Sequence, residues 1–194
     1  MIHPDTYIAE TVKGIGVFAK RKFRRGEILW IIDDIDAKMP MHVYEALDPI
    51  QKAKLEIYSY EDYDKRIIVP WDEGKYVNHS CAPNSIGLLQ FDTVSVAYRD
   101  IEKDEEIVED YYGYFGHFES FTCSCGAPNC RRVIKKDDTY NADLRLDLNE
   151  IAGLILSMPQ LLLEVQSKDS RPLKTFLRAY NQKNGKATAE HVVK

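Results

Sequence analysis

The sequence lacks both the long apolar runs of a membrane protein and the leader of a secreted one. No stretch reaches the roughly 18 consecutive apolar residues of a spanning helix, and the best apolar run, Ile151–Leu156, is interrupted by Gly153. The first residues show no basic segment followed by an apolar one, which a secretion signal would need. We therefore expect no membrane association and an intracellular location, cytoplasmic or nuclear.

The sequence also lacks an excess of positive charge. The chain has 26 basic and 31 acidic residues, which gives a net charge of −5 at pH 7. An acidic surface repels phosphate backbones, so we expect no direct nucleic-acid binding. A basic partner such as a lysine-rich peptide would fit it better. One small basic cluster keeps a zinc-ribbon nucleic-acid binder as an alternative: Arg131, Arg132, Lys135 and Lys136.

The chain changes character along its length. Its 194 residues suit one domain with a helical appendage. Short β-branched or aromatic runs, broken by turns, predict a mainly β domain, with strands at 17–19, 28–32, 66–69, 94–98 and 107–111. One helix is expected from about His42 to Tyr60, with its apolar face at Val43, Leu47, Ile50, Ala53, Leu55 and Ile57.

After about Asp137 the apolar pattern becomes helical, first at Leu144–Leu163 and then at Leu173–Tyr180. We expect residues 137–194 to form C-terminal helices that pack on the β domain. A separate partner-binding unit is the alternative.

The four cysteines have the spacing of a metal site. Cys123, Cys125 and Cys130 form C-x-C-x4-C around a bend at Gly126 and Pro128. Tetrahedral Zn2+ takes four soft ligands, and Cys81 is the cysteine left to complete the set. Two disulfides or four separate buried thiols are the alternatives; the missing secretion signal disfavours the first and the clustered spacing the second.

Four blocks of sequence resemble one family in the same order. Cys81 lies in Tyr76–Asn84 (YVNHSCAPN), which resembles the N-H-S-C-x-P-N signature of SET-domain protein-lysine methyltransferases. Residues 13–19 (KGIGVFA) resemble its G-x-G block, and residues 100–111 resemble the segment that ends in Asp-Tyr. Residues 123–131 (CSCGAPNCR) resemble its post-SET zinc motif.

The resemblance implies a fold and a division of the chain. The fold would be a mainly β, β-clip-like arrangement of small curved sheets, with the Asn78-His79 segment threaded through a pseudoknot. The SET domain would span 1–117, a post-SET zinc segment 118–136, and the helical extension 137–194.

The resemblance also implies S-adenosylmethionine as cofactor, one structural Zn2+, and a lysine-containing protein or peptide as substrate. Tyr111 would be the catalytic tyrosine, and it would also lie against the cofactor. The other expected cofactor contacts are Lys13, Gly14, Ile15, Gly16, Asn78, His79 and Phe121, with Tyr58 as a further candidate.

Two residues depart from the family pattern. Many members carry Phe or Tyr where this chain has Glu109, and others carry a tyrosine at the place of Gly87. Both positions are expected at the substrate channel. In a strand Glu109 would share a face with Tyr111, so its carboxylate could meet the substrate ammonium or lie at a solvated rim. The prediction is an active methyltransferase; the alternative is a catalytically weak SET-like zinc module that binds a protein partner.

Overall fold

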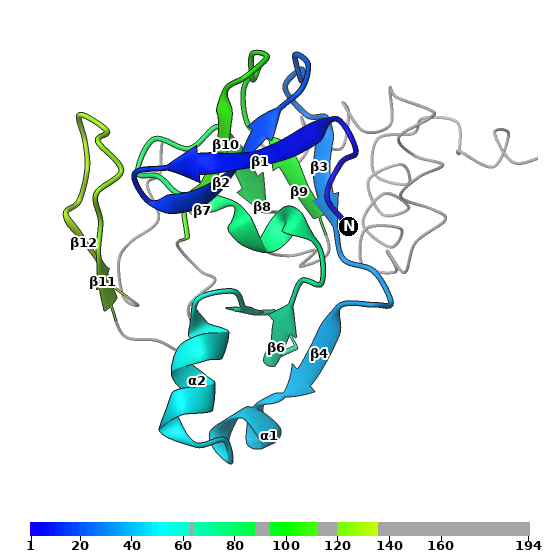
Figure 1. Cartoon of the computed structure of the whole chain (residues 1–194), viewed down its shortest axis with the longest axis vertical. Coiled ribbons are helices and arrows are strands. Elements are labelled where there is room, and N and C mark those ends of the chain that lie inside the picture. The colour runs from blue at the N-terminus through cyan, green and yellow to red at the C-terminus, as the bar shows by residue number, and fades with distance from the viewer. Residues whose placement is uncertain (63, 88–93, 112–119, 136–194) are drawn as a thin grey trace, which may run out of the picture.

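A computed structural model describes residues 1–62, 64–87, 94–111 and 120–135 (Figure 1). The predicted C-terminal helices of residues 137–194 lie outside this part of the chain. Within the described ranges, no helix is both long and apolar enough to cross a bilayer.

The described chain is built mainly from short strands, which confirms the predicted fold class. The strands are β1 Thr6–Thr11, β2 Gly14–Ala19, β3 Ile28–Ile31, β4 Ala37–Pro40, β5 Tyr60–Glu61, β6 Arg66–Val69, β7 Asn78–His79, β8 Ser85–Gly87, β9 Val94–Ala97, β10 Glu106–Glu109, β11 Ser120–Thr122 and β12 Val133–Lys135. They form a seven-stranded sheet, a three-stranded sheet of β4, β6 and β5, and the β11–β12 ribbon. Figure 1 shows the ribbon at one side of the main sheet and the helices beyond β6.

Strand β10 lies at the centre of the main sheet. Glu106 and Ile107 pair antiparallel with β2, whereas Val108 and Glu109 pair in parallel with β7. Glu109 also pairs with Ser85 of β8. The Asn78-His79 segment is therefore fixed beside the last residues of β10, which precede Tyr111.

The main core joins this sheet to β6. Val17, Phe23, Ile68, Ile101 and Ile107 are fully buried and belong to one cluster. Burying a side chain of this size contributes about 1.5–3 kcal/mol. The predicted strands at 17–19, 28–32, 66–69 and 94–98 are confirmed to within a few residues, and each contributes a buried residue to this core, such as Val17, Leu29, Ile68 and Ala97.

The single predicted helix is wrong. Two short helices replace it, α1 (Met41–Glu45) and α2 (Pro49–Glu56). Asp48 begins α2 by accepting from the N–H groups of Ile50 and Gln51, and Pro49 stands at the first helical position, where its missing N–H costs nothing. These two residues stop any helix that arrives from residue 42.

The predicted apolar helix face is wrong too. No residue of α2 is buried, and Ile50 and Ile57 are 71% and 67% exposed. Tyr44 is the buried side chain of α1. Its hydroxyl donates to Glu56 at 2.9 Å and so links the two helices.

The strand predicted over 107–111 ends two residues early. β10 stops at Glu109, because the N–H of Tyr111 donates to the His79 ring at 3.2 Å instead of to a neighbouring strand. Asp110 is held by the Arg131 guanidinium at 2.5 Å. Tyr111 therefore follows the strand and does not belong to it.

Candidate functional site

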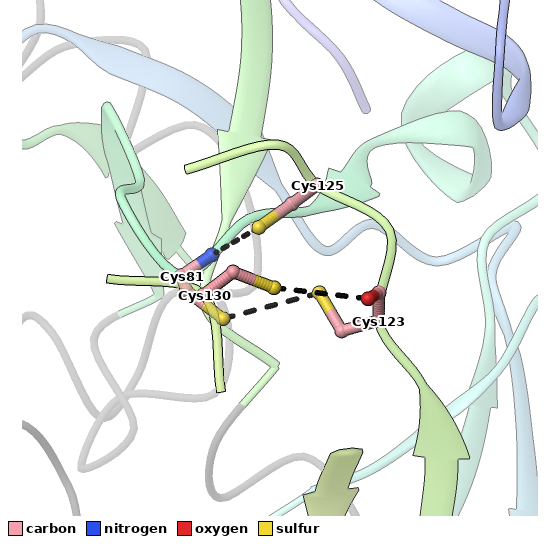
Figure 2. Close-up of side chains that lie close together, drawn as sticks. All are labelled: Cys81, Cys123, Cys125 and Cys130. Carbon is pink, nitrogen blue, oxygen red and sulfur yellow. Dashed lines mark hydrogen bonds between the residues drawn. The ribbon is translucent and has the colours of Figure 1, made fainter. Parts of the chain in front are cut away.

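The four cysteine sulfur atoms form one cluster (Figure 2), and all lie within 4.8 Å of one another. The Sγ atoms of Cys81 and Cys123 are 3.9 Å apart. Four thiolates about 2.3 Å from a tetrahedral zinc lie about 3.8 Å from each other, so the donor set fits this metal. All four cysteines are free, and their convergence within 4.8 Å argues against four separate buried thiols.

Backbone N–H groups surround these sulfur atoms. Arg131 donates to Cys81, Arg132 to Cys130 and Cys81 to Cys125, each at 3.4 Å. Burial by itself raises the pKa of Cys125, but the donors from Cys81 and Ala127 and the neighbouring thiols outweigh it and lower the pKa to about 6. Burial raises the pKa of Cys81. A divalent metal would replace the protons that such a cluster otherwise shares.

The cysteine cluster supports a small aromatic wall. Cys81, Cys123 and Ile134 are buried together, with Tyr111 and Phe121 packed against them. Phe121 lies in β11, and its ring centroid is 6.1 Å from that of Tyr111 and 5.4 Å from that of His79. The cysteines, the predicted catalytic tyrosine and Phe121, a predicted cofactor contact, thus share one cluster.

His79 is a neutral, buried member of this wall. Burial lowers the pKa of His79 to about 4, although the Asp110 carboxylate opposes the shift. Its Nδ1 accepts the Tyr111 N–H, so the proton of the neutral ring lies on Nε2. Nε2 is 3.4 Å from the sulfur of Cys81. The ring therefore connects the cysteine cluster to the backbone of Tyr111.

Tyr111 holds its hydroxyl in a fixed place. The hydroxyl donates to the Val77 carbonyl at 2.5 Å, directly before the Asn78-His79 pair. Burial raises the pKa of Tyr111, and the Glu109 and Glu106 carboxylates raise it further. The phenol is therefore protonated at neutral pH and can orient a neighbouring group, but it cannot act as a base.

The predicted G-x-G contacts lie beside Asn78. Gly14, the first residue of β2 after the turn from β1, has a φ of 106°, a conformation that favours glycine. The Asn78 amide donates to the Ile15 carbonyl at 3.0 Å. A Cβ on Gly16 would come within 2.7 Å of the Glu106 carboxylate and 3.1 Å of the Asn78 amide, so the glycine permits this close approach. Lys13 pairs with the same carboxylate at 3.1 Å.

The two departures from the family pattern are both buried. Glu109 is 8% exposed at the end of β10, which disfavours a solvated rim. Gly87 ends β8, pairs with Ser95 and is buried. Tyr58 follows the end of α2 and is 42% exposed. Its ring and that of Tyr76 are perpendicular, with their centroids 5.8 Å apart.

Three residues of the site were not predicted. Glu106 joins Lys13 to Asn78, and an Asp110–Arg131 ion pair connects the residue before Tyr111 to the one after Cys130. The only signal in the sequence was their position inside the 100–111 and 123–131 blocks, because their partners are distant along the chain.

Residues 14–112 match the sequence model of the SET domain. The chain belongs to the SET-domain family. Histone-lysine N-methyltransferase trr of Drosophila melanogaster is 28% identical over 66% of this chain. Histone H3-lysine(4) N-trimethyltransferase ATX1 of Arabidopsis thaliana is 28% identical over 63% of it. This SET-domain chain spans only 6% and 12% of the length of those relatives.

Solved structures of two further proteins are similar. A Plasmodium falciparum protein described as a histone methyltransferase covers 60% of this chain and 100% of its own, with 25% identity and a TM-score of 0.44. KRYPTONITE in complex with mCHH DNA, an H3(1–15) peptide and SAH covers 68% of this SET-domain chain and 30% of its own, with 19% identity and a TM-score of 0.48.

Proposed function

We propose that this chain transfers a methyl group from S-adenosylmethionine to the side-chain amine of a lysine in a protein substrate. The observation that carries the proposal is the placement of Tyr111. Its protonated hydroxyl is held at the Val77 carbonyl, and its ring lies against His79 and Phe121. These are the residues in which the family resemblance places the catalytic and cofactor contacts.

The chain's own residues would align the reaction and keep water from it. The bound cofactor supplies an activated methyl group on a sulfonium. The Tyr111 hydroxyl would orient the lysine nitrogen for in-line attack, and the rings of Phe121 and His79 would cover the adenosine and exclude water. The Glu109 carboxylate, beside the tyrosine, would attract the ammonium form of the lysine before it loses its proton.

The cysteine cluster would hold one Zn2+ in a structural role. Four thiolates leave no open position on a tetrahedral metal, so the ion would brace the Phe121 side of the site and take no part in the reaction.

The relatives supply the class of substrate to test. Several are named as histone-lysine methyltransferases, and the net charge of −5 suits a basic tail. We propose a lysine-rich protein such as a histone, met inside the cell, with no direct contact to nucleic acid.

Two measurements test this function. Calorimetric titration with S-adenosylmethionine should show binding, whereas the alternative, a pure interaction module, should show no heat. Methyl transfer from labelled cofactor should then appear on an array of lysine-containing peptides that includes the histone H3 tail. Matched peptides with arginine in place of each lysine are the control. Cofactor binding without lysine-dependent label on any peptide or histone would contradict the proposed activity.

A further inference from the structure

The side-chain amide of Asn78 is held in one orientation. Its amide group faces two oxygen atoms, the Ile15 carbonyl at 3.0 Å and Glu106 Oε1 at 2.8 Å. A carbonyl and a carboxylate can only accept, so the nitrogen of the amide must face them. Both hydrogens of that nitrogen are then in use.

This orientation decides what Asn78 can offer a ligand. With the nitrogen occupied, the remaining polar atom of the side chain is Oδ1, which can only accept. Among the described residues none donates to Oδ1. The next partner of Asn78 must therefore be a donor, such as an ammonium group.

Glu106 also fixes a cation at the same place. The oxygen that accepts from Asn78 lies 3.1 Å from the Lys13 ammonium, and the two side chains are only 17% and 22% exposed. Gly16 leaves the space that this carboxylate fills, because a Cβ there would come within 2.7 Å of it. The site thus presents an acceptor and a cation side by side, which complements the ammonium and carboxylate of an α-amino acid.

We propose that Glu106 is a positioning residue that acts through Asn78 and so makes the cofactor site selective for a ligand with an α-amino acid end. Glu106 and Ile15 hold the amide nitrogen, which turns Asn78 Oδ1 toward the α-ammonium. The Lys13 ammonium would pair with the α-carboxylate. This inference rests on the proposed function, since it assigns the amino acid end of the methyl donor to this corner.

Binding of three ligands distinguishes this positioning role of Glu106 from a role in the stability of the fold alone. S-adenosylmethionine and S-adenosylhomocysteine both carry the amino acid end. Methylthioadenosine keeps the adenosine and the sulfur but lacks that end. Calorimetry on the full chain gives the affinity of each ligand, and the melting temperature of each variant shows whether it is folded.

Glu106→Leu removes the acceptor and should weaken both amino acid ligands about 10-fold or more, the usual effect of losing a hydrogen bond to a charged group. The affinity for methylthioadenosine should change less than about 2-fold. Glu106→Gln keeps a weaker, neutral acceptor, so binding of the two amino acid ligands should weaken only about 3-fold. Binding of methylthioadenosine should again change little. This variant serves as the test if the leucine variant does not fold. Glu102→Gln is the matched control, because its side chain is 66% exposed on the approach to the same strand.

A double variant tests whether Glu106 acts through Asn78. Asn78→Ala with Glu106→Leu should bind S-adenosylmethionine no more weakly than Asn78→Ala alone, because the orienting residue has nothing left to orient. The inference would be overturned if the losses of affinity in the double variant were additive. It would also be overturned if the Glu106 variants bound all three ligands equally more weakly, or if both bound them as the wild type does. If the wild-type chain binds no S-adenosylmethionine, the proposed function itself fails, which is a different outcome.

Discussion

Glu109 places a buried carboxylate beside Tyr111, whose pKa is raised by burial and then by this charge. The same charge would act on a lysine ammonium that approaches this tyrosine, and the attraction grows where water is excluded. An ionised Glu109 would therefore favour substrate binding and oppose loss of the proton that must precede attack.

Glu109→Gln should raise the KM for a peptide substrate about 3- to 10-fold, and lower kcat less, because a charge-assisted contact is lost. Without the carboxylate the lysine amine loses its proton more easily, so the rising limb of the pH–rate profile should move to lower pH. Glu109→Phe should change the ratio of methylated products, read by mass spectrometry. Glu10→Gln, on an exposed position of β1, is the control. Unchanged KM, pH profile and product ratio in both variants would remove Glu109 from the channel.

Tyr111→Phe removes one hydroxyl and keeps the ring in its cluster. Turnover should fall about 10²-fold, the scale for losing a positioned polar group. The affinity for S-adenosylmethionine should change little. Tyr7→Phe is the matched control, since its hydroxyl bonds Asp104 at 3.1 Å on the outer strand β1. Single-turnover methyl transfer and calorimetry measure both quantities, and equal turnover in wild type and variant would argue against the catalytic role.

Between the elements, Tyr44 makes the link from α1 to α2 sensitive to alkali. Burial, then the Glu56 carboxylate, raises the pKa of Tyr44 to about 12, whereas in an unfolded chain it is about 10. Between these values the unfolded chain gives up the proton first, so this contribution to stability is present below about pH 10 and is lost as the pH rises toward 12.

Tyr44→Phe should therefore cost about 1 kcal/mol at pH 8, from the lost hydrogen bond, and the difference from wild type should shrink above pH 10. Urea unfolding at pH 8 and pH 11 measures this. A gap that widens with pH would contradict the assigned direction.

The elements differ in how far the sequence could predict them. Runs such as Ile28–Ile31 and Arg66–Val69 carry a β signal in their own side chains, so their prediction succeeded. The two-residue strand β7 has no such signal, because its partner Val108-Glu109 lies about 30 residues away. The predicted helix failed at Asp48, where the capping of a new helix outweighed the apolar spacing.

The site shows the same limit. The cysteine cluster followed from ligand chemistry, because thiolates at this spacing have few other uses. Tyr111, Asn78 and Phe121 came from the family resemblance, and the structure brings them close together. Glu106 and Arg131 could not be predicted, since their roles arise from pairs that form only in the folded chain, with Lys13 and Asp110.

At the scale of the whole molecule, the cysteine cluster joins the Cys81 segment to the β11–β12 ribbon. Purified protein should carry about one zinc per chain. Cys125→Ser should lower this content, weaken binding of S-adenosylmethionine and raise amide exchange across 120–135, because metal binding is coupled to folding. Ser124→Ala, exposed between two of the cysteines, should do none of these. Less than about a tenth of an equivalent of zinc after mild purification would contradict the metal assignment.

The position of β10 has a consequence for how the chain reaches its native state. Strand β10 is late in the sequence, yet it pairs with β2, β7 and β8. A growing chain therefore exposes the edges of those strands until residue 109 has been synthesised. Such long-range pairing slows folding and prolongs the exposure of unpaired edges. The centre of the main sheet is completed last. A nascent chain that stops short of Glu106 can pair β1 with β2 and β8 with β9, but it lacks β10, the strand with which its Asn78-His79 segment pairs.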